Sequence, residues 1–405
     1  MQYSIFSVFG VELEYMIVNR DTLQVMPIAD KLLNKVAGSP VSDYDNGLVS
    51  WSNELVNHVI ELKTTEPTPN LSEFSQAFHD NVVEINKLLL EWNAMLLPTG
   101  AHPLMNPYTE MVLWPHEHSQ IYKLYNRIFD CRGHGWANLQ STHINLPFSN
   151  TKEFAQLHAA IRLLIPIIPA LTASTPILDG KITGLSDSRL ETYRHNQKKI
   201  PVISGMVIPE AVYSEEAYTQ EIFNPIKEAI TPYDQDKILD TLFLNSRGAI
   251  ARFDRGAIEI RIIDIQEAPK ADIALVNFIT LILKKIVSEK WSAWDDHSKI
   301  GTSDLAQIFQ EVIKTGQATI IQHTNYLQQF GIEHAHSAKD VWLKLFHEVE
   351  EEMLVSDYKV IQHILKYGNL SKRIMDELPQ EPTEKDINRV YQALAQCLAN
   401  NQLYE

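Results

Sequence analysis

Four short segments of this chain alternate apolar residues with charged or polar ones, and this alternation constrains the fold more than any other feature. They are GVELEY at 10–15, HVIELK at 58–63, STHINLPF at 141–148 and AIEIRII at 257–263. In a β-strand, residues i and i+2 share one face, so each segment would present one apolar and one polar face. The pattern predicts a largely antiparallel sheet with one face buried in a core.

The polar face of this predicted sheet is rich in carboxylates. Unpaired carboxylates in a low-dielectric interior are costly, so we expect a cation on this face. Mg²⁺ or Mn²⁺ takes oxygen ligands and tolerates an imidazole, whereas zinc is less expected without a set of thiolates. The alternative is an ordinary solvated sheet face. The candidate ligands of a cluster of two or three metal ions are Glu12, Glu14, Glu61, His143 and Glu259, and Lys63, Asn145 and Arg261 share their face.

Arginines cluster around the last of these segments, in NSRGAIARFDRGAIEIR at 245–261. Guanidinium groups bind phosphate and carboxylate in a bidentate manner, so metals and arginines on one face suit a polyphosphate such as a nucleotide. Salt bridges to Asp254, Glu259 or Asp264 are the alternative role for each arginine. No G-x-x-x-x-G-K-[ST] loop and no G-x-G-x-x-G motif is present, so phosphate is not expected in a glycine-rich loop. The four arginines are Arg247, Arg252, Arg255 and Arg261.

Other catalytic chemistries find less support in the sequence. The chain has no G-x-S-x-G motif of a serine hydrolase. Cys131 lies beside Arg132, but a single cysteine is more often a small buried apolar residue than an activated thiol. The spacing of His116, His118 and His134 matches no common zinc pattern, so polar or substrate-lining roles are preferred for them.

The composition excludes several classes of protein. The formal net charge of −16, from 35 Lys and Arg against 51 Asp and Glu, argues against a nucleic-acid-binding surface. With only two cysteines, Cys131 and Cys397, no disulfide framework is expected. Glu12 and Glu14 interrupt the first hydrophobic segment, so no signal peptide is expected, and the longest apolar stretch, 163–173, is shorter than the ~20 residues of a membrane span. We predict a cytoplasmic protein without a membrane partner.

Strands and helices are mixed along the first two-thirds of the chain. Strands are predicted at 4–18, 57–64, 139–147 and 249–265, and amphipathic helices at 71–97 and 151–173. After Ala268 nearly all of the sequence has helical periodicity. Because the strands do not alternate regularly with helices, the predicted class is α+β with a largely antiparallel sheet.

Taken in order, GVELEY, HVIELKTTEP, STHINLPF and AIEIRIIDIQEAP resemble the metal and substrate strands of glutamate-cysteine ligases and related carboxylate-amine ligases. PALTASTPILDGKITGLSDSRLETY also resembles a segment of that family in which an arginine follows a turn of small residues. The resemblance covers about two-thirds of the chain and implies a glutamine-synthetase-like fold, with a curved antiparallel sheet and helices on its outer face. It divides the chain into a catalytic domain at 1–296 and a helical region at 297–405 packed on that core.

The resemblance also implies roles for individual residues. The four glutamates and His143 would hold metal, Arg189 would contact substrate or phosphate, and Arg261 would contact the transferred phosphoryl group. Arg252, Arg255, Lys63 and Asn145 are further candidates for contacts to the nucleotide. One departure is that Asn145 stands where the carboxylate-amine ligase branch often has a second histidine. A second is that the C-terminal third carries no motif.

The activity that the resemblance implies is the joining of a carboxylate, such as that of glutamate, to an amine, such as that of cysteine. ATP and Mg²⁺ or Mn²⁺ would be required, and an acyl phosphate would be the intermediate. Three alternatives stay open: the same chemistry with another amine, a non-catalytic nucleotide-binding relative, and metal-dependent hydrolysis without ATP. The sequence does not fix the amine or the oligomeric state.

Overall fold

The computed structural model describes residues 3–405, and its central element is an eight-stranded antiparallel sheet. Seven strands form a continuous path, and β5 (Ala94–Leu97) lies off this path, paired with the far end of β1. The order across the sheet is β2 (Asp43–Asn46), β3 (Val49–Asn53), β4 (Val59–Thr64), β1 (Gly10–Asn19), β6 (Ser141–Pro147), β10 (Ala257–Asp264) and β9 (Ala249–Arg252).

The two faces of this sheet differ as the alternation predicts. Most apolar residues of the four predicted segments lie in one hydrophobic core, with relative exposures near zero. Register between the strands fixes which polar residues become neighbours, because Glu12 of β1 pairs with Lys63 on one side and His143 on the other. The buried apolar set includes Val11, Leu13, Tyr15, Ile60, Leu62, Ile144, Leu146, Ile258, Ile260 and Ile262.

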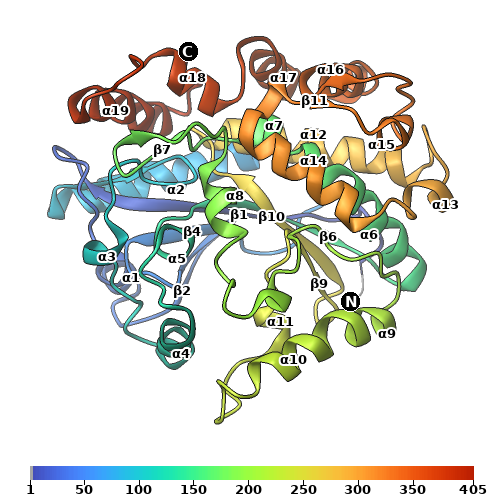
Figure 1. Cartoon of the computed structure of the whole chain (residues 1–405). Coiled ribbons are helices and arrows are strands. Elements are labelled where there is room, and N and C mark those ends of the chain that lie inside the picture. The colour runs from blue at the N-terminus through green and yellow to red at the C-terminus, as the bar shows by residue number, and fades with distance from the viewer. Residues whose placement is uncertain (1–2) are drawn as a thin grey trace.

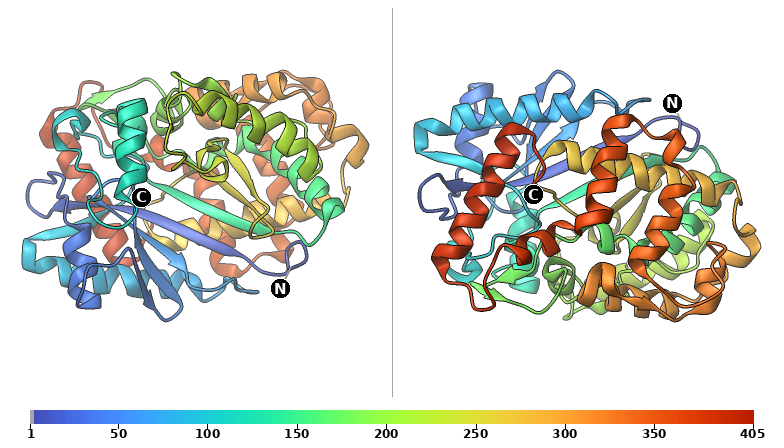
Figure 2. Two further views of the ribbon diagram at one scale, coloured as in Figure 1. Left: turned by 90° about the horizontal axis from the view of Figure 1, so that it is seen from below. Right: turned by 90° about the horizontal axis from the view of Figure 1, so that it is seen from above.

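Three long helices share that core with the apolar face. They are α2 (Phe74–Leu89), α6 (Thr151–Leu164) and α12 (Pro269–Val287), and their buried residues belong to the same cluster as those of the strands. The C-terminal helices form a further layer, in which α17 (Val355–Tyr367) packs on α12 and α19 (Glu384–Asn400) packs on α2 and β5. Figure 2 shows this layer from above, in orange and red.

Shorter helices and loops border the polar face. Figure 1 shows α5 and α8 in front of the strands and α4 and α11 below them, whereas α12 lies above them. The shorter helices that precede β9 in the chain are α1 (Ala29–Ala37), α3 (Pro107–Glu110), α4 (Ser119–Phe129), α5 (His134–Ala137), α7 (Pro169–Thr172), α8 (Ser188–Tyr193), α9 (Glu215–Tyr218), α10 (Asn224–Ile230) and α11 (Thr241–Leu244).

The C-terminal third is helical apart from one two-stranded ribbon. Its other helices are α13 (Trp294–His297), α14 (Thr302–Thr315), α15 (Thr324–Gln328), α16 (Ala338–His347) and α18 (Leu370–Asp376), and the ribbon pairs β11 (Ile320–Ile321) with β12 (His336–Ser337). A second small ribbon, of β7 (Ile177–Leu178) and β8 (Lys181–Ile182), precedes α8. The proposed boundary at 296/297 stays a prediction.

Three predicted elements differ from the structure. The first strand begins at Gly10, six residues later than predicted, because Ser4–Ser7 form a turn closed by a hydrogen bond from the Ser7 amide to the Ser4 carbonyl. The helix predicted at 71–97 ends at Leu89, and Asn93 with φ +51° directs the chain into β5. The strand predicted at 249–265 is a hairpin of β9 and β10, whose turn contains Gly256 with φ +64°.

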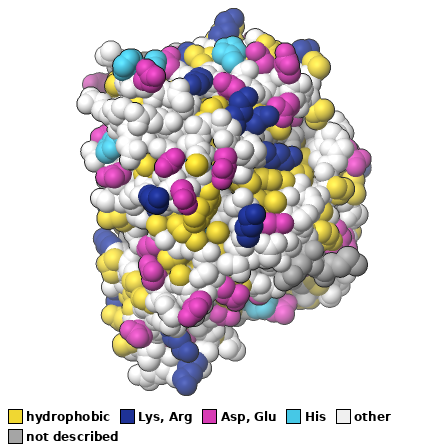
Figure 3. All heavy atoms as spheres, turned by 90° about the vertical axis from the view of Figure 1, so that its right-hand side faces the viewer, with side chains coloured by type: hydrophobic (Ala, Val, Ile, Leu, Met, Phe, Trp, Pro, Cys, Tyr) yellow, Lys and Arg dark blue, Asp and Glu magenta, His cyan; other side chains and the backbone are white. Residues whose placement is uncertain are grey.

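No helix in the described part of the chain is both long and apolar enough to cross a membrane. On the side of the molecule shown in Figure 3, basic side chains are scattered among acidic ones, and apolar side chains gather near the middle of the view. Both cysteines are free: Cys131 is buried in the core, and Cys397 is half-buried.

Candidate active site

Four glutamates and one histidine from four strands converge on the polar face of the sheet. Glu12, His143 and Glu259 offer ligand atoms that all lie within 4.8 Å of one another, and so do Glu14, Glu61 and His143. His143 is therefore shared by two adjoining groups of possible ligands. Carboxylate oxygens with one imidazole nitrogen form a donor set that suits Mg²⁺ or Mn²⁺.

This face is not an ordinary solvated sheet face. Glu14, Glu61 and Glu259 are only 7%, 8% and 5% exposed, although each lies close to another carboxylate. Charges so far removed from water require compensation by cations or hydrogen bonds. The solvated-face alternative is thus excluded for these side chains.

Imidazole contacts organise the group. His143 Nδ1 lies 2.7 Å from Glu12 Oε2 and 3.8 Å from Glu259 Oε1, and His143 Nε2 lies 3.8 Å from Glu14 Oε1. The second carboxylate oxygen of Glu14 accepts hydrogen bonds from a residue outside this group. Ser141 donates from its amide at 2.6 Å and its hydroxyl at 2.9 Å to Glu14 Oε2. One histidine on β6 therefore contacts three of the four glutamates.

The clustered carboxylates shift one another's proton affinities. Burial alone would lower the pKa of His143, but its hydrogen bond to Glu12 and the charges of Glu14, Glu12 and Glu259 raise it to about 9. Burial opposes ionisation of Glu12, yet the hydrogen bond and charge of His143, with the charge of Arg261, lower its pKa to about 2. Burial, with the negative charges of Glu12 and Glu54, raises the pKa of Glu61 well above its usual value. The group is short of positive charge, as expected for a site that accepts cations.

Two of the predicted arginines border this group directly. Arg261 pairs with Glu259 two residues earlier on β10, and Arg252 of β9 pairs with Asp254 at 3.0 Å and lies 3.9 Å from Glu259. The salt-bridge alternative therefore holds for both residues. Both also line a cavity of about 400 Å³ over the polar face, so their guanidinium groups can still meet a ligand.

Three of the residues predicted to contact the nucleotide differ in their position relative to the cavity. Lys63 lines the cavity and forms a salt bridge with Asp43, with Nζ 2.9 Å from Oδ1. Asn145 donates to Glu12 Oε1 at 3.0 Å and does not line the cavity, so it orients a candidate ligand instead of facing the opening. Arg255 has a side chain 64% exposed, contacts Asp254 and lies outside the cavity lining. Its role as a nucleotide contact stays a prediction, without a position in the cavity to support it.

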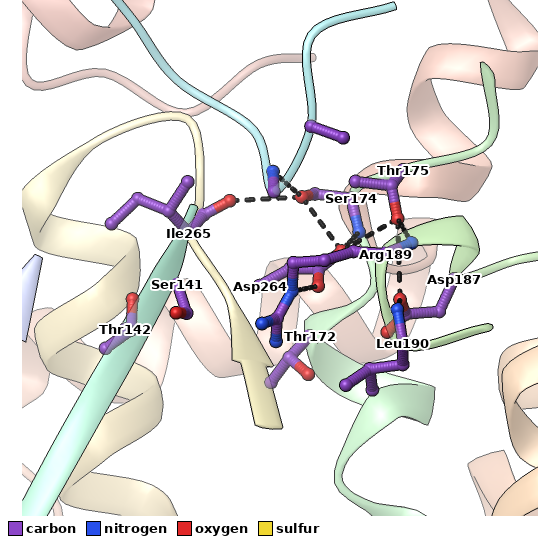
Figure 4. Close-up of polar contacts among 12 residues, drawn as sticks. Ser141, Thr142, Thr172, Ser174, Thr175, Asp187, Arg189, Leu190, Asp264 and Ile265 are labelled. Carbon is purple, nitrogen blue, oxygen red and sulfur yellow. Dashed lines mark hydrogen bonds and ion pairs between the residues drawn. The ribbon is translucent and has the colours of Figure 1, made fainter. Parts of the chain in front are cut away.

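A buried aspartate, Asp264, holds the Arg189 side chain in position. The Arg189 guanidinium Nε donates to Asp264 Oδ1, and the arginine side chain is 2% exposed but still lines the cavity. Asp264 Oδ2 also accepts from the Ser174 amide at 2.8 Å and the Thr175 hydroxyl at 3.1 Å. Figure 4 shows these side chains converging between the end of β10 and α8. Arg247, by contrast, pairs with Glu210 and does not line the cavity.

Sequence patterns missed part of the cavity wall. Glu54 follows β3, and burial together with the charge of Glu14 raises its pKa to about 7. The aromatic side of the cavity comes from short helices, which carry no strand alternation to mark them. Periodicity could not find these residues because their position depends on how α4, α5 and α8 pack over the sheet. The aromatic set is Tyr122, Tyr125, Trp136, Tyr193 and Phe243.

The two rival sites considered from the sequence do not form. Among residues 3–405, no group of possible metal ligands includes His116, His118 or His134; His116 pairs with Asp30 at 3.4 Å and His134 with Asp179 at 3.1 Å. Cys131 is fully buried, and burial raises the pKa of its thiol to about 12. The cavity over the sheet is thus the candidate active site.

The fold that positions this site is shared with solved ligases. The structure matches a glutamate–cysteine ligase from Francisella tularensis in complex with AMP with a TM-score of 0.65 at 13% identity, covering 98% of this chain and 90% of that one. It matches a bifunctional glutathione synthetase from Pasteurella multocida with a TM-score of 0.60 at 12% identity, covering 98% and 52%. The predicted α+β fold, with a largely antiparallel sheet and a helical C-terminal region, is confirmed, and it is the fold of these two solved proteins.

The sequence assigns the chain to one family. The profile of glutamate-cysteine ligase family 2 matches residues 8–393, and the chain belongs to that family. An uncharacterized protein from Archaeoglobus fulgidus is 33% identical over 395 residues, which cover 98% of this chain and 99% of that protein. Family membership supports the assignment of the chain as a ligase.

Proposed function

We propose that this protein is an ATP-dependent carboxylate–amine ligase that forms an amide through an acyl phosphate. The observation that carries the proposal is the convergence of Glu12, Glu14, Glu61, Glu259 and His143 beside Arg261 on the wall of one cavity. Family membership supports a ligase, and a related fold has been solved with AMP. Glutamate and cysteine are the first substrates to test.

The reaction divides into two steps. A carboxylate oxygen of the substrate attacks the γ-phosphorus of ATP, ADP leaves, and an acyl phosphate forms. The amine then attacks the acyl carbon, phosphate leaves with the bonding electrons, and the amine loses a proton. Neither step needs a side-chain nucleophile, which agrees with the absence of an accessible thiol in the described cavity.

In this reaction the residues of the chain act mainly by binding and orienting the substrates and ATP. The acidic group would hold Mg²⁺ or Mn²⁺, which would supply charge neutralisation for the ATP phosphates. Arg261 and Arg252 offer guanidinium groups to the transferred phosphoryl group and its neighbours, and Arg189 offers one to the carboxylate substrate or to phosphate. Asp264 fixes the direction of Arg189. Positioning of this kind lowers the barrier without covalent participation of the protein.

The direct test is an assay of the purified full chain with glutamate, cysteine, ATP and Mg²⁺. We expect release of ADP with an equal amount of amide, measured by coupled spectrophotometry and mass spectrometry. Release of ADP should require both substrates. Absence of ADP with every carboxylate and amine tried would contradict the proposal.

The amine acceptor needs a separate experiment. A panel of amines offered with glutamate and ATP, with products detected by mass, would identify the preferred acceptor. A product from an amine other than cysteine would keep the chemistry and change the substrate. Turnover of a substrate in nucleotide-free buffer would instead favour metal-dependent hydrolysis.

A substitution tests whether the acidic group takes part in nucleotide binding. Glu259→Gln removes one charge from the acidic group, and we expect nucleotide affinity in the presence of Mg²⁺ to fall at least tenfold by isothermal titration calorimetry. The matched control is Glu228→Gln on the exposed side of α10, which should bind as the parent does. Equal affinities in both variants would argue against a nucleotide site at this group.

A further inference from the structure

A second cavity lies away from the acidic site, among the C-terminal helices. Its volume is about 660 Å³, within the range of small-molecule sites. It opens between the β7–β8 ribbon with the turn that follows it, the end of α14, and the junction of α17 with α18. These elements lie together at the top of Figure 1. We refer to it as the lysine groove.

The charge of the lysine groove is opposite to that of the chain. Four lysines line it, Lys314, Lys339, Lys366 and Lys372, and no aspartate or glutamate does. Among residues 3–405, only Lys372 of these four has a carboxylate partner within 4.0 Å, which is Asp376. In a protein with a formal net charge of −16, three ammonium groups without carboxylate partners around one hollow leave a local positive field.

Between the lysines the lining is mainly apolar. Pro176, Ile182 and Leu185 contribute from the ribbon and its turn, and Met375 contributes from α18. The Asn369 side chain is already engaged within the protein, since it donates to the Ala170 carbonyl at 3.1 Å and caps α18 by accepting from the Lys372 amide at 3.0 Å. An apolar hollow edged by ammonium groups suits a ligand with an apolar body and an anionic head.

The lysine groove also adjoins the segment that carries Arg189. Ser186 lines the groove, and its amide donates to the carbonyls of Ile313 at 3.1 Å and Lys314 at 3.0 Å. Three residues further on, the Arg189 amide is held by the Thr175 hydroxyl at 3.1 Å, and the Arg189 side chain enters the acidic site. Residues only three positions apart in the chain therefore line the two cavities.

We infer that the lysine groove is a second ligand site, which binds a small organic anion with an apolar body. This inference does not depend on the proposed ligase activity, because it concerns a cavity with a different lining and the opposite charge. A carboxylate, a sulfonate and a phosphate share the required chemistry. Competition among them identifies the preferred head group.

The test uses 8-anilino-1-naphthalenesulfonate, an apolar body with one sulfonate, titrated into the full-length protein and followed by fluorescence. We expect saturable binding of one equivalent, displaced by decanoate or decyl phosphate and not displaced by ATP with Mg²⁺. Lys314→Glu combined with Lys366→Glu should weaken binding at least tenfold. The matched control is Lys227→Glu, an exposed lysine of α10 outside the groove, which should leave the affinity unchanged.

A substitution that alters no charge provides a second test of the groove. Ala318→Trp places a large side chain at an exposed position of the lining and should also weaken binding at least tenfold, while circular dichroism confirms the fold. Unsaturable binding, displacement by ATP, or equal affinity in parent, double variant and Ala318→Trp would overturn the inference. Dimerisation that the double variant abolishes would assign the groove to a second copy of the chain and would overturn it as well.

Discussion

Arg261 lines the cavity while its guanidinium group pairs with Glu259, so its geometry matters as much as its charge. We expect Arg261→Lys to lower kcat about 100-fold, or about 2.7 kcal/mol in the barrier, because an ammonium group cannot replace a bidentate contact to a phosphoryl group. Steady-state release of ADP measures the effect. Arg389→Lys is the control, since Arg389 on α19 is 57% exposed, lies outside the cavity lining and should retain the parent rate. Comparable losses in both variants would contradict the assigned geometry.

Asp264 is the residue on which the position of Arg189 depends. It is fully buried and accepts hydrogen bonds from Ser174, Thr175 and Arg189. We expect Asp264→Asn to cost about 3–5 kcal/mol in free energy of unfolding, because it leaves a buried guanidinium without its counter-charge. Urea unfolding followed by circular dichroism provides the measurement.

A matched aspartate–arginine pair at the surface tests this explanation. Asp254 pairs with Arg252 at 3.0 Å, but its side chain is 40% exposed. Asp254→Asn should therefore cost less than about 1 kcal/mol. If the two substitutions cost the same, burial of the Asp264 pair would not be the reason for its contribution.

At the scale of strands and helices, the alternation of apolar and polar residues predicts which face of a strand is buried. It predicts poorly where a strand or helix begins and ends. It identifies the polar face that carries Glu12, Glu61 and Glu259, because a pleated strand leaves no other way to bury its apolar residues. It does not show that α2 stops at Leu89 or that the stretch after Ala249 is a hairpin, because single residues with positive φ decide those ends. Contacts between helices and the sheet place the aromatic wall of the cavity, and no local pattern encodes them.

Close packing between a loop and the end of β10 gives a prediction at the same scale. A Cβ added to Gly100 would lie 2.6 Å from the carboxylate carbon of Asp264, and the Gly100 amide is fixed by the Ser174 hydroxyl at 2.8 Å. We expect Gly100→Ala to destabilise the fold by about 1–3 kcal/mol through overpacking, as measured by urea unfolding. Gly133→Ala is the control, because nothing lies within 4 Å of the added Cβ and φ is −159°; its effect should stay within about 0.5 kcal/mol.

Over the whole molecule, the sequence predicted the class of fold and the position of the acidic site but not the second cavity. The four strands that carry the acidic site can be predicted because apolar and polar residues alternate along them. The lysine groove is assembled from segments between Pro176 and Met375 that are distant in sequence, and each lysine alone is an ordinary surface residue. Only the packing of the C-terminal helices against the rest of the fold brings these lysines together.

Stability of the whole fold should depend on pH through His158, a buried residue of α6 that stacks on Phe154 with ring centroids 5.2 Å apart. Among residues 3–405, neither ring nitrogen of His158 has a hydrogen-bond partner. Burial, with the positive charges of Arg162 and Arg247, lowers its pKa to about 3. The imidazole is therefore neutral in the folded protein throughout the mildly acidic range.

The sign of the effect follows from the difference in proton binding. Below the ordinary histidine pKa of about 6.5, the unfolded chain binds a proton at this residue and the folded protein does not, so stability falls as pH falls towards 3. At one site this amounts to about 1.4 kcal/mol per pH unit, or about 2 kcal/mol between neutral pH and pH 5. His158→Leu removes the site, so the variant should gain about 2 kcal/mol relative to the parent over that interval, whatever its stability at pH 7. Urea unfolding at pH 7, 6 and 5 measures the difference, with His334→Gln, an exposed histidine, as the control. A constant difference between His158→Leu and the parent at all three pH values would show that the buried imidazole takes up its proton without unfolding.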